Sequence, residues 1–180
     1  MPLFVNILAF QIGWFACVLG AANSAPLLGP AIVAAVVALH LSRSNQPARE
    51  MTLVLAAGLL GAVWDSALVA AGWIQYPSGN VIAGLAPYWI VAMWMLLATT
   101  LNVSLRWLRG RTALTVVLGG LSGPLAFLAG AGLGGVTFLE PRSGLVALAL
   151  GWAVILPLLS VLSTRLDGMA LASAGERAHV

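Results

Sequence analysis

The sequence predicts an all-α polytopic membrane protein, a bundle of six transmembrane helices. The first observation is composition: of 180 residues, 61% are hydrophobic and only 7% are charged. Soluble domains carry about 25% charged residues, so a soluble enzyme is a poor interpretation. The second is that four long segments contain no charged residue, namely 1–42, 66–105, 112–139 and 143–164. Because one membrane span needs about 20 apolar residues, the first two segments are each long enough for two passes.

Turn residues separate the six expected helices. The first two are joined by a turn at 23–26, and the polar loop 42–50 ends the second. The polar run 75–80 ends the third, Pro87 suits the first turn of the fourth, and the arginine-rich loop 106–111 follows it. The helices are therefore predicted over residues 3–22, 27–41, 51–74, 85–105, 112–131 and 143–163.

The last third of the chain is less regular. The fifth helix contains Pro124, and a kink is expected near Pro157 in the sixth. Residues 132–141 either extend the fifth helix or form a loop at the membrane interface. The expected division is a six-helix transmembrane domain over 1–163 and a polar cytoplasmic tail over 164–180.

The arginines predict the orientation. With the N-terminus inside, seven of the eight arginines fall on the cytoplasmic side and only Arg142 falls outside. Positively charged loops stay in the cytoplasm, so both termini are predicted to lie inside. A net charge of +3 that is spread over loops and tail does not form the basic face that a nucleic-acid partner needs.

Of the charged residues, Asp65 is the one that lies inside a predicted membrane-spanning helix, the helix over 51–74. At about 1.5 Å per residue it lies about 21 Å from the inner end of its helix, slightly outward of the midplane. Gln11 and Trp14 on the first helix, and Met93 and Trp94 on the fourth, are expected at similar depths. A carboxylate there carries a proton, acts as an acid or base, pairs with a cation, or simply holds helices together by hydrogen bonds.

A second polar group is expected near the inner leaflet. Asn6, His40 and Asn102 come from three helices and share one depth, and Arg106 follows closely. With Gln11 they form the candidate lipid- or substrate-binding set, although a single interfacial histidine is also commonly just solvated. No second ligand has helical spacing to His40, so no metal site is expected, and no cofactor is predicted.

Small residues recur at a spacing of four on several helices. The first helix carries Ala9, Gly13, Cys17 and Ala21, and the fifth carries a run of glycines. Such faces let helix backbones approach closely in lipid. They predict tight packing within the chain, or alternatively a homo-oligomer or a docking face for another membrane protein.

Four stretches resemble a known family, and together they cover most of the chain up to about residue 163. They are NILAFQIGWFACVLG at 6–20, PYWIVAMW at 87–94, ATTLNVSLRW at 98–107 and GPLAFLAG at 123–130. They are similar to a family of small bacterial inner-membrane proteins that is described only as a domain of unknown function. Members are often encoded beside cyclopropane-fatty-acid-synthase-like, amine-oxidase-like and photolyase-like genes. This neighbourhood implies stress-linked modification of membrane lipids.

Three functions remain open at this point. The first is an accessory protein in fatty-acyl lipid modification that binds membrane lipid near the inner leaflet. The second is a small-solute transporter or a substrate-binding membrane subunit. The third, an intramembrane enzyme centred on Asp65, lacks a second catalytic group, so no catalytic residue is assigned.

Overall fold

The computed structural model describes residues 2–170 and confirms the all-α polytopic class. Four of its helices, α1, α3, α5 and α6, are long and apolar enough to cross a membrane. In chain order the elements are α1 (Leu3–Ala22), α2 (Leu28–Ser42), α3 (Pro47–Ala70), β1 (Ile74–Gln75), α4 (Tyr88–Leu101), the 3-10 turn η1 (Arg106–Leu108), α5 (Thr112–Gly132), β2 (Thr137–Phe138) and α6 (Pro141–Arg165).

The helices α2 and α4 are shorter than the other four. With 15 and 14 residues they extend only about 21–22 Å, whereas the hydrocarbon core is about 30 Å thick. The expected count of six spans, and the orientation of the bundle, stay predictions.

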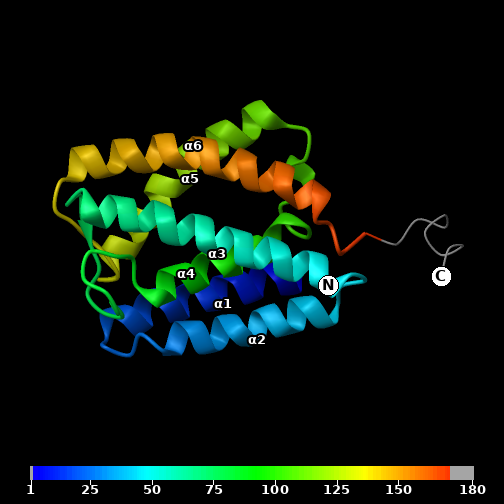
Figure 1. Cartoon of the computed structure of the whole chain (residues 1–180), viewed down its shortest axis with the longest axis horizontal. Coiled ribbons are helices and arrows are strands. Elements are labelled where there is room, and N and C mark those ends of the chain that lie inside the picture. The colour runs from blue at the N-terminus through cyan, green and yellow to red at the C-terminus, as the bar shows by residue number, and fades with distance from the viewer. Residues whose placement is uncertain (1, 171–180) are drawn as a thin grey trace, which may run out of the picture.

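Helix α4 lies at the centre of the bundle. It packs against α1, α2 and α3, while α5 packs mainly against α6 on the opposite side (Figure 1). Glycines make these approaches close: the ring of Trp94 lies directly on the backbone of Gly61, and Leu96 lies on Gly13. These small residues therefore serve packing within the chain.

The two ends of the bundle differ. At one end, β1 pairs with β2 in antiparallel register, Ile74 with Phe138, and this end is called the hairpin end. Segment 132–141, left open by the sequence, forms a turn and the strand β2 here. The other end, called the tail end, carries the N-terminus of α1 and the residues that follow α6 (Figure 1).

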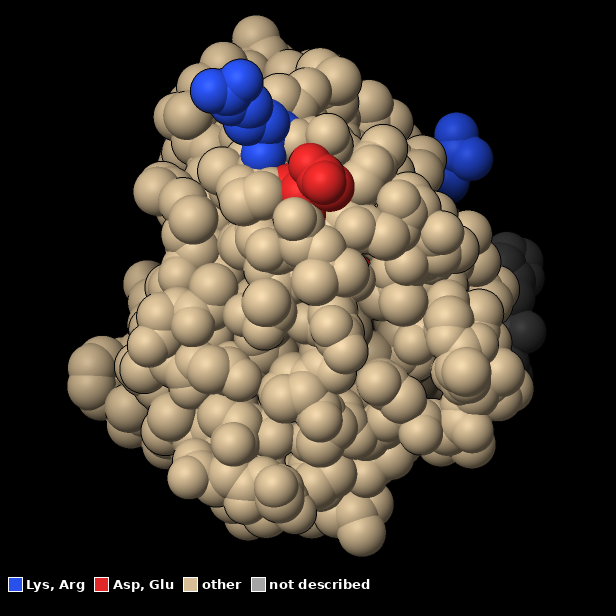
Figure 2. All heavy atoms as spheres, turned by 90° about the vertical axis from the view of Figure 1, so that its left-hand side faces the viewer, with Lys and Arg blue, Asp and Glu red and all other residues tan. Residues whose placement is uncertain are grey.

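Arginines gather at the tail end. Within the described residues Arg43, Arg49, Arg106, Arg109 and Arg111 lie in or beside its loops, and Arg165 ends α6 there. The hairpin end has few charged side chains (Figure 2). This asymmetry agrees with the sequence argument for a cytoplasmic tail end.

Candidate functional site

A buried polar cluster occupies the tail end, and Glu50 is its centre. Helix α3 begins at Pro47 rather than at the expected residue 51, because proline suits a first helical turn, and this places Glu50 on the helix. The side chain of Glu50 is fully buried. Its Oε2 lies 2.8 Å from Nε2 of His40, and its Oε1 accepts from Nδ2 of Asn102 at 2.6 Å.

The segment after α6 completes this cluster. The backbone N–H of Gly168 donates to Oε1 of Glu50 at 2.7 Å, and the carbonyl of Gly168 accepts from Ser44, Asn45 and Gln46. A side chain at position 168 would collide with the carbonyl of Gln46. The loop before α3 thus holds the described start of the expected tail against the bundle.

Arginines extend the cluster toward the surface. Arg109 donates to Oδ1 of Asn102 and, at 2.7 Å, to Asp167, which also pairs with Arg106. Partial burial alone would raise the pKa of Asp167, but the hydrogen bonds from Arg109 and Arg106 outweigh it and hold the pKa below its ordinary value. The carboxylate of Asp167 therefore stays ionised across the neutral range.

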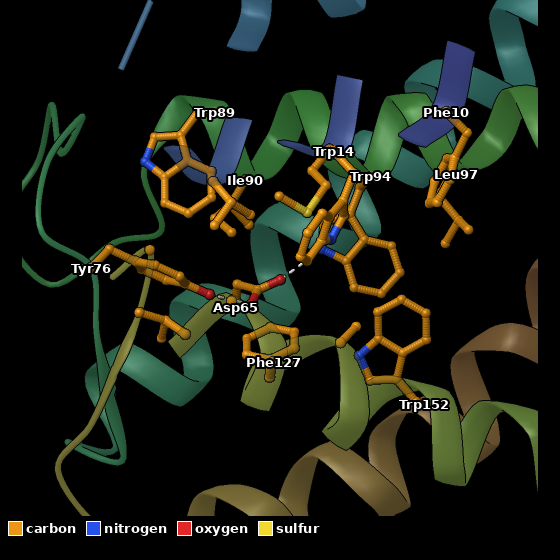
Figure 3. A pocket seen from close by; sticks show the side chains of 16 residues that line it. Phe10, Trp14, Asp65, Tyr76, Trp89, Ile90, Trp94, Leu97, Phe127 and Trp152 are labelled. Atoms are coloured by element: carbon orange, nitrogen blue, oxygen red, sulfur yellow. Dashed lines mark hydrogen bonds between the residues drawn. The ribbon is translucent and has the colours of Figure 1, made fainter. Parts of the chain in front are cut away.

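An apolar cavity of about 90 Å³ lies between α1 and α4 on one side and α5 and α6 on the other. Phe10, Trp14 and Phe127 in its wall are only partly buried, so it opens on the outer surface of the bundle. Seven aromatic side chains line it: Phe10, Trp14, Tyr76, Trp89, Trp94, Phe127 and Trp152 (Figure 3).

Asp65 is the carboxylate residue among those that line the cavity. It is fully buried, and each carboxylate oxygen accepts one short hydrogen bond, Oδ1 from the hydroxyl of Tyr76 and Oδ2 from Nε1 of Trp94, both at 2.6 Å (Figure 3). Asp65 lies five residues from the end of α3, about 8 Å below the hairpin end. The cavity extends from this level to the middle of the bundle, because Phe10 of α1 and Trp152 of α6 also line it.

Ring contacts fix the aromatic walls in place. Trp94 stacks on Trp152 with ring centroids 4.7 Å apart, and Tyr76 meets Trp89 edge-on at 5.3 Å. The indole Nε1 of Trp152 is buried without a hydrogen-bond partner among the described residues. A wall made of paired rings is a preformed surface, which suits ligand binding.

The structure brings some of the sequence-predicted residues together and separates others. His40 and Asn102 meet at Glu50, and Arg106 joins them through Asp167. Asn6 is also buried but makes no hydrogen bond to Glu50. It donates to the carbonyl of Thr99 on α4 and accepts from the N–H of Ser104, which follows α4. Gln11 is exposed on α1, and Asp65 lies near the opposite end of the bundle.

Several important residues were missed by sequence reasoning. Glu50 was placed in a loop, and Pro47 three residues before it was the signal for an earlier helix start. Arg109 and Asp167 lie in segments without a periodic pattern. Tyr76 reaches Asp65 only because the chain folds back after α3. Trp94 was expected at the depth of Asp65, and the structure shows their hydrogen bond.

The fold defines an all-α polytopic protein whose long helices are suited to a membrane, with one buried polar group around Glu50 and another at Asp65. Within residues 2–170, no group of three or more His, Cys, Asp or Glu side chains is placed to hold a metal ion. A family model described as "Protein of unknown function (DUF2878)" matches residues 3–158. The chain belongs to this family, as the resemblance of its four stretches implied. No curated protein and no solved structure matches the chain significantly.

Proposed function

We propose that the protein binds membrane lipid in the aromatic cavity and serves as an accessory protein in the modification of fatty-acyl lipids. The observation that carries the proposal is the cavity itself, which opens on the side of the bundle and has almost wholly apolar walls. An apolar cavity of this kind stays dry and favours an apolar occupant.

The surroundings of the opening support a lipid as the occupant. Leu8 and Ile12 on α1, and Leu125 and Leu128 on α5, are exposed on the outer faces of two helices that line the cavity, as expected of helix surfaces that contact acyl chains. Within the described residues the buried Nε1–H of Trp152, which lines the cavity, has no acceptor, and an unpaired buried donor is costly.

The proposed site is not the one that the sequence pointed to. Asn6, His40 and Asn102, the expected inner-leaflet set, are fully buried, and a headgroup there would have to displace their bonds to Thr99, Glu50 and Arg109. If the tail end is cytoplasmic, the aromatic cavity takes lipid from the outer leaflet.

Filling the cavity will weaken lipid binding. In Ala126→Phe the new ring enters the cavity, so we expect affinity to fall about tenfold or more, which corresponds to about 1.4 kcal/mol of lost contact. The measurement is quenching of tryptophan fluorescence by phospholipids brominated on their acyl chains, with the protein in nanodiscs. Native mass spectrometry counts the lipids that the protein retains.

Ala129→Phe is the matched control. It adds the same ring to the same helix, but Ala129 is exposed and is not part of the cavity wall. We expect wild-type quenching for this variant. Equal quenching in wild type and both variants would mean that no lipid enters the cavity.

The accessory role is tested in a cell that carries the gene. Deletion is expected to change the membrane fatty-acid profile under singlet-oxygen stress, and Ala126→Phe is expected to reproduce that change. An unchanged profile contradicts the role in lipid modification but leaves the binding measurement untouched.

A transporter or a substrate-binding membrane subunit is the second candidate, and the buried carboxylate of Asp65 favours it, because intramembrane carboxylates mark ion and substrate pathways. Solute uptake into proteoliposomes, or co-purification with an energising ATPase, would favour this function over the first.

A further inference from the structure

A second cavity lies at the tail end of the bundle, in a groove between the beginning of α5 and the last turns of α6. It is called the tail-end groove, and its volume is about 250 Å³. Hydroxyl-bearing and apolar residues both line it, among them Thr112, Thr115, Ser160, Thr164, Leu108 and Val161. The tail-end groove therefore offers hydrogen-bonding groups, which the walls of the aromatic cavity hardly do.

Two of the four hydroxyls in the groove have no hydrogen-bond partner within residues 2–170. Thr115 and Thr164 each donate to a backbone carbonyl of the preceding turn. The hydroxyls of Thr112 and Ser160 make no such bond in the described part of the chain. A hydroxyl donates one hydrogen bond and accepts two, so both groups are available to a molecule in the groove.

The surroundings of the tail-end groove carry positive charge. Arg111 directly precedes α5, and Arg165 is the last residue of α6; both are exposed, and neither forms an ion pair with another described residue. Asp167, the acidic side chain that follows α6, is already shared by two other arginines. Since positive charge is left over here, the groove is complementary to an anion.

The groove lies at the level where the headgroups of a membrane are expected. Thr112 begins α5, and Thr164 is one residue from the end of α6. Trp107 is 51% exposed and has the guanidinium of Arg111 5.8 Å from its ring centroid, and tryptophan is enriched at membrane–water interfaces. Val161, also 51% exposed, lines the groove, so an apolar surface adjoins the hydroxyls.

We propose that the tail-end groove binds a phosphate group, which accepts hydrogen bonds from the hydroxyls of Thr112 and Ser160 while Arg111 supplies positive charge. Phosphate combines negative charge with several acceptor oxygens, so it matches both the free donors and the unbalanced arginines. Its source is the headgroup of an anionic lipid or free phosphate. This site is separate from the aromatic cavity and goes beyond the proposed function.

The test compares dioctanoyl phosphatidic acid with dioctanoylglycerol, which has the same acyl chains and no phosphate, by titration calorimetry on the full chain in dodecyl maltoside. Wild type is expected to bind the phosphate-bearing lipid about tenfold or more tightly, as expected for hydrogen bonds to a charged group. The preference disappears in the double variant Thr112→Val/Ser160→Ala, which removes both free hydroxyls. It persists in Ala126→Phe, because Ala126 lines the aromatic cavity instead.

Two arginine variants separate a site from a diffuse field. Arg111→Gln and Arg43→Gln remove the same charge from the same end of the molecule, but Arg43 is exposed directly after α2, whereas Arg111 is next to Thr112. We expect Arg111→Gln to weaken the binding of phosphatidic acid about tenfold. Arg43→Gln is expected to bind it as wild type does.

Inorganic phosphate, titrated in the same way, distinguishes the two sources. Tighter binding of phosphatidic acid than of inorganic phosphate identifies a lipid headgroup. Inorganic phosphate that binds at least as tightly, and more weakly to the double variant, identifies free phosphate. Both results support the inference.

Three results overturn it. The first is equal affinity of wild type for phosphatidic acid and dioctanoylglycerol, which needs no variant and so does not depend on whether a variant folds. The second is a preference that persists in the double variant. The third is an equal loss in Arg111→Gln and Arg43→Gln. None of them touches the proposed function, which depends on the quenching of wild type and Ala126→Phe.

Discussion

Replacing Glu50 with alanine is expected to lower the free energy of unfolding by about 3–5 kcal/mol, because three buried polar groups lose their hydrogen-bond partner at about 1–3 kcal/mol each. Glu50 is fully buried, is hydrogen-bonded to His40, and accepts from Asn102 and the backbone of Gly168. The substitution leaves these three groups without their partner in a place that water does not reach. It also releases the segment after α6.

The measurement is unfolding in mixed micelles of dodecyl maltoside and sodium dodecyl sulfate, followed by the reaction of a thiol-specific fluorophore. Cys17 is the single cysteine of the chain and is 1% exposed, so it reacts only after the bundle opens. Glu140→Ala is the control, because Glu140 is exposed, and its stability should match wild type. A wild-type midpoint for Glu50→Ala would show that the cluster does not stabilise the fold.

A methyl group at position 119 is expected to cost about 1–3 kcal/mol of stability, although alanine is the better helix former. At Gly119 the added Cβ would collide with the carbonyl oxygen of Trp152, which belongs to the backbone of α6 and cannot move aside by changing a rotamer. The helices α5 and α6 must therefore separate. Because Trp152 also lines the aromatic cavity, lipid affinity should fall with stability.

The neighbouring glycine supplies the control for this prediction. A Cβ at Gly120 lies 3.4 Å from the carbonyl of Ala149, an ordinary contact, so Gly120→Ala should be neutral or slightly stabilising. Both variants are compared in the same thiol-accessibility assay. Equal stability of Gly119→Ala and Gly120→Ala would mean that α5 and α6 adjust freely to the extra methyl group.

The helices could be predicted well because composition and turn residues determine them locally. The first helix has the expected bounds, 3–22, and the others differ by a few residues at their ends. The larger differences have physical causes. Pro47 starts α3 early, and the strand β1 takes Ile74 out of the expected third helix because it pairs with Phe138, far along the chain.

The candidate sites were predicted in part, and the missing part is tertiary. Depth along a helix can be estimated from 1.5 Å per residue, so Asp65 and Trp94 were correctly expected at one level. The position of a residue along its helix does not show which loop segment will fold back and contact it. Tyr76 and Gly168 reach Asp65 and Glu50 through folding that no local pattern encodes.

The two buried carboxylates differ in what lies around them. Glu50 is hydrogen-bonded to groups from α2, from the residue that follows α4 and from the segment after α6, and it lines neither of the two cavities. Asp65 accepts from Tyr76 and Trp94 beside the apolar cavity. Both side chains are fully buried and hold separate segments of the chain together.

The contact between Glu50 and Gly168 also has a consequence for biosynthesis. Glu50 is among the first 50 residues to leave the ribosome, whereas the N–H that completes its hydrogen bonds is made 118 residues later. Until Gly168 arrives, Oε1 of Glu50 lacks one of its donors at the end of the bundle. The tail end of the bundle therefore reaches its final hydrogen bonding only when nearly the whole described chain has been made.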